Sequence, residues 1–166
     1  MSQALLQTLQ GQRGDLVETV TQRLRKSTAT HYQNLDPNLL HDRAARLVDT
    51  FLKSLASAPG DFGRYIHDIT EERISEGFFL QEIQTALNIL EEKAWQIAVA
   101  AAARAAAADL GRDLALISGT IGAAKDQLAL VYLEHKERAE SRAARLEAKL
   151  HELFKGTDAP PLVEDD

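Results

Sequence analysis

The side chains that could take part in chemistry are the five histidines and the carboxylates near them. His67 precedes Glu71 by four residues, which would place both on one face of a helix, where they could hold a metal ion. The same spacing is also typical of an ordinary surface contact. Neither His-Glu-x-x-His nor the Glu-x-x-His pair of di-iron bundles occurs. We therefore predict no metal site, and structural or surface roles for the histidines.

Other catalytic patterns are absent as well. The chain has no glycine-rich phosphate loop, no Gly-x-Ser-x-Gly elbow and no cysteine, which excludes thiolate nucleophiles and cysteine-ligated metals. Gly119 and Gly122 lie in an apolar helical pattern and favour a close helix contact over a phosphate site. The sequence predicts a protein that is not an enzyme and has no cofactor.

Composition narrows the class of protein further. The 166 residues carry a formal net charge of −6, which disfavours binding of nucleic acid through a basic face. The N-terminus lacks the basic and apolar regions of a signal peptide, and no uninterrupted apolar stretch of about 18 residues occurs. We expect a cytoplasmic protein without a membrane span.

Apolar residues follow a helical period almost everywhere, and β-branched residues are sparse, so we predict an all-α fold. Asp36 followed by Pro37 is a strong helix start, Asp61 is expected to cap another helix, and Gly77 to end it. The expected helices are 2–9, 16–34, one from Pro37 to about Ala58, one from Asp61 to Gly77, 80–108 and 113–154.

The last of these helices changes character along its length. Its first half is apolar, whereas residues 134–149 are rich in Glu, Arg and Lys. About 40 residues would span roughly 60 Å, more than the roughly 35–40 Å of a compact domain of this size, so we expect the helix to protrude. A heptad-like seam predicts pairing with a second copy. The expected interface residues are Leu128, Tyr132, Ala139, Leu146 and Leu150.

Three segments follow from this pattern. Residues 1–133 should form the folded domain, residues 134–155 a coiled-coil-like helical extension, and residues 156–166 a disordered acidic tail.

The segment from Glu72 to Leu87, followed by Leu90 and Trp95, resembles the N-terminal domain of the RsbRD family, the RsbT co-antagonist proteins of bacterial stressosomes. The shared pattern is an Arg, then Gly-Phe, Leu, an acidic residue, Ala-Leu and a Trp, and the resemblance covers about residues 10–135. Phe79 stands where the family has a capping residue such as Ser. Because Phe cannot accept amide bonds, no side-chain cap is expected there.

The resemblance implies a globin-like bundle of about five to six helices. In related haem-binding sensors the proximal His precedes a Gly by four residues, but here Arg73 precedes Gly77. Arginine has no lone pair for iron, so the resemblance implies a non-haem domain. His67 lies six residues earlier and is rotated by about 120° around the helix from Arg73, so it does not simply substitute.

The resemblance further implies a sensory domain that dimerises and signals, or docks to a protein partner, through its last helix in stressosome or histidine-kinase pathways. The chain carries neither a STAS nor a kinase domain, so it is either a stand-alone sensor or adaptor or part of a longer protein; Met1 and the acidic end favour the former. A small apolar ligand could enter a cavity. The expected cavity residues are Tyr65, Ile69, Arg73, Phe78, Leu87 and Trp95.

Alternatives remain open. Trp95 lies on the apolar side of a long helix and is expected in the core, with a place in a cavity wall as the alternative. The protein could instead be a ligand carrier, either a haem globin using His67 or a binder of a molecule such as a fatty acid. An enzyme whose site holds a metal at His67 and Glu71 is a further alternative, and a purely structural bundle is the remaining one.

Overall fold

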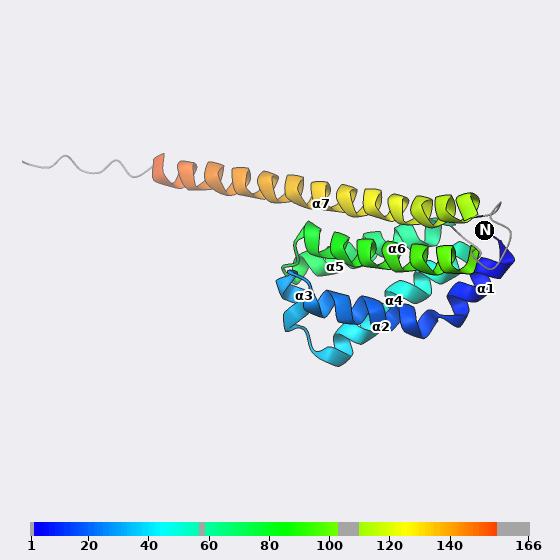
Figure 1. The fold of residues 1–166 in the computed structure, drawn as a ribbon. Helices are drawn as coiled ribbons and strands as arrows, with labels where there is room; N and C mark the ends of the chain where they lie inside the picture. Colours follow the sequence, from blue (N-terminus) through cyan, green and yellow to red (C-terminus); the bar gives the residue numbers. More distant parts are fainter. Residues whose placement is uncertain (1, 57–58, 103–109, 156–166) are drawn as a thin grey trace, which may run out of the picture. The chain divides into compact units, whose positions relative to one another are not determined.

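Seven helices, and no strand, make up the part of the chain that the computed structural model describes, which is residues 2–56, 59–102 and 110–155 (Figure 1). The all-α prediction is confirmed, as is the long C-terminal helix. In chain order the helices are α1 (Gln3–Gly11), α2 (Arg13–Lys26), α3 (Thr30–Asn34), α4 (Pro37–Ala56), α5 (Pro59–Ser75), α6 (Leu80–Ala102) and α7 (Leu110–Lys155).

The start of α4 follows the prediction and that of α5 does not. Asp36 Oδ1 accepts hydrogen bonds from the backbone amides of Asn38 and Leu39 at 2.9 and 3.1 Å, so Asp36 caps α4. Helix α5 begins at Pro59, and Asp61 lies inside its first turn. The prediction that Asp61 is the cap was wrong, because proline already has the backbone angle of a first helical residue.

The predicted helix over residues 16–34 is in fact two helices, α2 and α3. Ser27 adopts an extended backbone after α2, its hydroxyl donates to the Leu24 carbonyl at 2.7 Å, and it accepts from the Ala29 amide at 3.2 Å. A serine side chain that bonds to nearby backbone competes with the helix, so the continuous-helix prediction was wrong.

The core forms where the apolar faces of these helices meet. Helix α2 packs against α4 and α6, and α4 packs against α5. Phe51 of α4 and Phe62 of α5 are fully buried, with ring centroids 5.5 Å apart. The first part of α7 adds four residues to the same core, Ile117, Ile121, Ala124 and Leu128.

Polar contacts tie the start of α7 to α1 and α6. Asp113 is 5% exposed and accepts from the amide and hydroxyl of Ser2 at 2.7 and 2.6 Å. Trp95 Nε1 donates to Ser118 Oγ at 3.0 Å. Trp95 is 43% exposed, so its placement in the core was a wrong prediction; the indole instead keeps its N–H paired at the surface.

The chain divides into two compact units, residues 1–132 (unit 1) and 133–166 (unit 2), and α7 runs through the boundary as one 46-residue helix. Part of α7 is long and apolar enough to cross a membrane, but that window is 33% buried in the fold, and core helices pass the same test. All residues from Leu133 to Lys155 are exposed. The expected acidic tail, and the end of the predicted helix over 80–108, lie outside the described residues.

Candidate functional site

A small pocket lies inside unit 1, where residues from α2 to α6 meet. Its volume is about 30 Å³, room for about two water molecules. Two arginines and two tyrosines supply its polar groups, and none of its lining residues is a carboxylate. The lining residues are Arg43, Arg73, Tyr32, Tyr65, Leu24, Ala44, Leu47, Ile66, Ile69, Ile83, Ala86 and Leu87.

The two arginine side chains are almost completely buried, at 10% exposed for Arg43 and 7% for Arg73. Glu76 bridges them, with one oxygen 2.8 Å from Arg43 Nη2 and the other 3.2 Å from Arg73 Nη1. Glu72 lies 3.0 Å from the same Arg73 nitrogen. Burial raises the pKa of Glu76, but the two guanidinium groups outweigh it and hold this pKa below its usual value. Glu76 is therefore ionised and partly neutralises both arginines.

Phe78 holds the arginines from a second side. Its ring centroid lies 5.9 Å from the guanidinium carbon of each of Arg43 and Arg73, within cation–π range. The ring of Tyr32 meets Phe78 edge-on at 5.0 Å, and His31 stacks on it at 4.8 Å. Because Phe78 is only 5% exposed, these contacts fix the guanidinium groups at the pocket.

One buried donor of a residue that lines the pocket has no partner, and two tyrosine hydroxyls make no bond within the described protein. Arg43 Nη1 is buried without a hydrogen-bond partner, and the hydroxyls of Tyr32 and Tyr65 make no hydrogen bond to any residue in the described ranges. Burial raises the pKa of Tyr32 to about 12 against the lowering effect of Arg73 and Arg43, and burial also raises the pKa of Tyr65. Both hydroxyls therefore stay protonated at neutral pH and can donate.

The end of α5 places Phe78 at this position. Gly77 has a positive φ of 91°, its amide bonds to the Ile74 carbonyl at 3.0 Å, and the Phe78 amide bonds to the Arg73 carbonyl at 2.9 Å. This is the Schellman motif, in which a left-handed residue closes the helix. The prediction that Gly77 ends the helix is confirmed.

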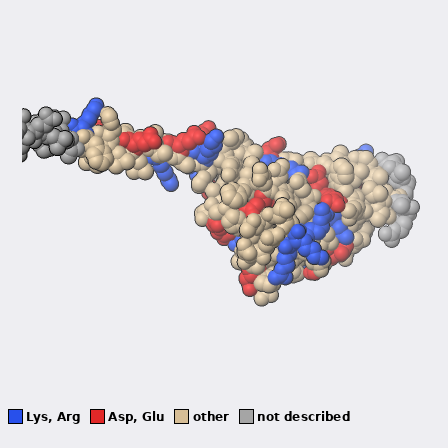
Figure 2. All heavy atoms as spheres, turned by 60° about the vertical axis from the view of Figure 1, so that its left-hand side comes forward, with Lys and Arg blue, Asp and Glu red and all other residues tan. Residues whose placement is uncertain are grey.

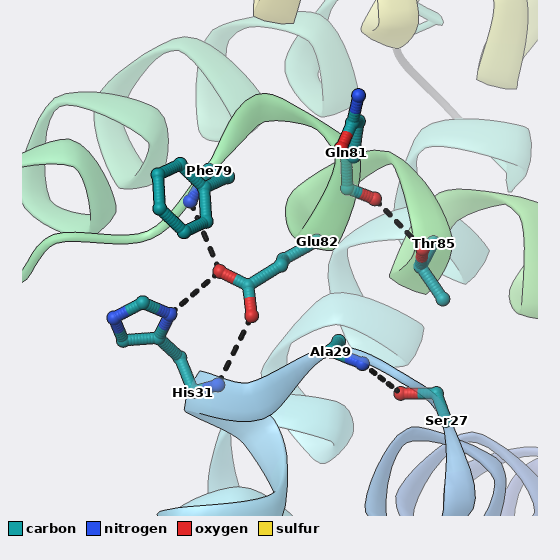
Figure 3. A network of polar contacts seen from close by, with 7 residues as sticks. All are labelled: Ser27, Ala29, His31, Phe79, Gln81, Glu82 and Thr85. Atoms are coloured by element: carbon teal, nitrogen blue, oxygen red, sulfur yellow. Dashed lines mark hydrogen bonds and ion pairs between the residues drawn. The ribbon is translucent and has the colours of Figure 1, made fainter.

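Helix α6 has a cap that sequence reasoning missed (Figure 3). Glu82 is 6% exposed, and one of its oxygens accepts from the Phe79 amide at 3.0 Å. That oxygen also lies 2.7 Å from His31 Nδ1, and the other accepts from the His31 amide at 3.0 Å. The signal was present in the sequence, since a glutamate three residues after the cap position can reach back to the cap amide. Glu82 thus joins α6 to α3.

Four of the six expected cavity residues, Tyr65, Ile69, Arg73 and Leu87, line the pocket. Phe78, the fifth, does not line the pocket but packs against Arg43 and Arg73, which do.

Trp95 lies elsewhere, in a surface groove with Asn88, Glu91 and Glu92. Sequence reasoning missed Arg43 and Tyr32. Arg43 could have been found as a charge three residues after Leu40, within the apolar stripe of α4.

His67, considered above as a haem ligand, does not line this pocket. It borders an open surface groove with Gly63 and Gln127, and its Nδ1 lies 3.3 Å from Asp68 Oδ1. Among the described residues, no three side chains of the metal-binding types gather at one place.

The expected interface residues of α7 divide between the two units. Leu128 is 1% exposed within the core of unit 1, and Tyr132 is partly buried there. Ala139 is exposed, as are Leu146 at 62% and Leu150 at 52%. Acidic and basic side chains alternate with other side chains along this part of α7 on the face that Figure 2 shows.

A family model described as the RsbT co-antagonist protein rsbRD N-terminal domain matches residues 14–147. The matched region includes the pocket and extends beyond unit 1 into the exposed part of α7. No curated protein and no solved structure gives a match.

Replacing Gly77 by alanine should lower the free energy of unfolding by about 1–2 kcal/mol, because a side chain is strained at its positive φ. An added Cβ would also lie 3.4 Å from His31 Nε2. Urea unfolding measures the change. Gly119→Ala is the control, since that Cβ would meet nothing within 4 Å in a helix, and it should leave stability equal or higher. Equal stability of wild type and Gly77→Ala would contradict the assignment.

Replacing Glu82 by glutamine should lower the free energy of unfolding at pH 7 by about 1–3 kcal/mol, since charge-assisted bonds to two amides and His31 are weakened. Burial raises the pKa of Glu82, but hydrogen bonds to Phe79 and His31 outweigh it and the pKa is lowered. Its contribution is therefore present above the unfolded-state pKa of about 4.3 and is lost as the pH falls through the folded-state pKa.

The difference between wild type and Glu82→Gln should accordingly shrink in urea unfolding at acidic pH. The exposed Glu18→Gln on α2 is the control and should change stability by less than about 0.5 kcal/mol. A difference that stays constant from pH 7 to pH 3 would show that the carboxylate charge is not the cause.

Proposed function

Because the chain belongs to the family of RsbT co-antagonist protein RsbRD N-terminal domains, we propose that it is a haem-free, globin-like sensory domain that forms a homodimer and signals to a protein partner through α7. The family is one of stressosome-related signalling domains and is regulatory, not a known enzyme family. The proposal places the protein in the cytoplasm.

The observation that carries the proposal is the exposed apolar face of α7 in unit 2. Leu146, Leu150 and Leu153 follow one another at spacings of four and three, and are 62%, 52% and 72% exposed. These spacings bring them to the same side of the helix. Helices in proteins owe most of their stability to packing of such a face, so this one requires a partner surface.

A second copy of the chain is the partner that fits this face best. An apolar seam flanked by charges of both signs is self-complementary about a two-fold axis. Residues 133–155 carry six Lys or Arg and five Glu, so neither sign dominates and two copies do not repel each other. Leu128 is buried in the core of unit 1 and is not available to a second copy. In the proposed dimer, the contacts between the two α7 helices therefore start at Tyr132 and continue through Ala139.

The state of Arg73 supports the haem-free part of the proposal. At the position where related sensors have a histidine, its guanidinium is buried, ion-paired with Glu72 and Glu76, and placed beside Phe78. A guanidinium offers no lone pair to iron. His67 lies in a surface groove and not in the pocket that Arg73 lines.

Replacing Leu146 and Leu150 together by glutamate should convert a dimer of twice 18.3 kDa into a monomer, because four carboxylates would meet at the seam. Light scattering after size exclusion measures the mass. The matched control is Ala144→Glu with Ala148→Glu, which adds the same charges roughly 160° away on the same helix and should leave the dimer intact. A monomeric wild type, or an unchanged mass of the leucine variant, would refute the proposed interface.

Adding hemin and removing the excess should leave no stoichiometric Soret band between 250 and 700 nm, because Arg73 cannot ligate iron. The His67→Ala variant should give the same spectrum as wild type. A sharp band that disappears in His67→Ala would overturn the haem-free assignment.

A further inference from the structure

We propose that the pocket of unit 1 binds a small carboxylate of about the size of acetate, held by Arg43 and Arg73 with the hydroxyls of Tyr32 and Tyr65. All four residues lie in unit 1, so the site does not depend on the α7 dimer proposed above. It would give the domain a class of ligand to sense.

The side chains that line the pocket favour an anion. Its lining holds two guanidinium groups and no carboxylate. Glu76, which neutralises both arginines in part, is 34% exposed, and Glu72 is 57% exposed, so both acids lie nearer to solvent than the arginines. The two glutamates balance the two arginines in formal charge, but they leave the buried Arg43 Nη1 without an acceptor, which the oxygen of a bound anion would supply.

The unused donors match the acceptors of a carboxylate. Arg43 bonds to Glu76 through Nη2, which leaves the buried Nη1 without a partner. An unmade hydrogen bond at a buried charged group is strongly unfavourable, and guanidinium groups bind the planar carboxylate particularly well. The protonated hydroxyls of Tyr32 and Tyr65 can donate to the same two oxygens.

Size and apolar walls define the class of ligand. A volume of about 30 Å³ admits a group equivalent to about two waters and excludes a fatty acid or a haem. The rest of the lining is aliphatic, including Leu47, Ile69 and Leu87, and would contact a methyl group favourably. A purely inorganic anion would leave this surface without a partner, which is why we choose a small carboxylate.

The test is a titration of the full chain with sodium acetate at constant ionic strength, followed by thermal unfolding and by calorimetry. Acetate should raise the unfolding temperature in a saturable way, since a ligand that binds only the folded state stabilises it. Acetamide, which has the same shape without the charge, should have no effect. Nitrate, a planar anion without a methyl group, should bind at least about fivefold more weakly.

Variants assign the effect to the pocket. Arg43→Gln should weaken acetate binding by about tenfold or more, and Tyr65→Phe by severalfold. Arg25→Gln is the control, because it removes the same charge from an exposed position on α2 and should bind acetate as wild type does. Tyr65→Phe removes a hydroxyl that has no protein hydrogen bond, so it keeps the test valid even where Arg43→Gln fails to fold.

Four results would overturn the inference: no saturable effect of acetate, an equal effect of acetamide, equal affinity for nitrate, or unchanged acetate affinity in both pocket variants. In the first case water alone satisfies the unused donors. Binding should persist in the Leu146→Glu, Leu150→Glu double variant. The experiments can therefore refute the proposed dimer without refuting acetate binding, and the reverse.

Discussion

The burial of two arginines against one phenylalanine is the constraint on which the folded unit depends. A guanidinium leaves water only where its charge is met, and here Glu76 and the ring of Phe78 contact both Arg43 and Arg73, while Glu72 also pairs with Arg73. The two arginines come from α4 and α5, and the aromatic ring from the turn that follows α5. Movement of that turn would take the Phe78 ring away from the two guanidinium groups. The contacts therefore hold the helices on either side of the turn in one arrangement.

The local geometry of the turn follows from that requirement. Gly77 closes α5 in the left-handed conformation, Phe78 enters the core immediately afterwards, and Glu82 caps α6 while binding α3 through His31. The pocket that the arginines line lies directly beside this corner. A ligand there would act on three helix ends at once, which offers a physical route from binding to a change in the domain.

The chain separates two tasks along one helix. The first part of α7 is embedded in the core of unit 1 through Ile117, Ile121 and Leu128, whereas the part that follows exposes its apolar side chains. The family model extends to residue 147, so it covers residues of both parts.

The all-α class, the long last helix, the start of α4 after Asp36 and the end of α5 at Gly77 could be predicted from the sequence, because they depend on periodicity and on single residues with strong backbone preferences. The sequence also carried the family pattern around Gly77 and Phe78. Three features follow from the tertiary structure alone: Arg43 and Tyr32 join Arg73 and Tyr65 at one pocket, Glu82 binds His31 of α3, and Trp95 lies at the surface. These depend on which side chains from distant segments meet, and helical spacing fixes the direction of a side chain on its own helix without fixing what it meets.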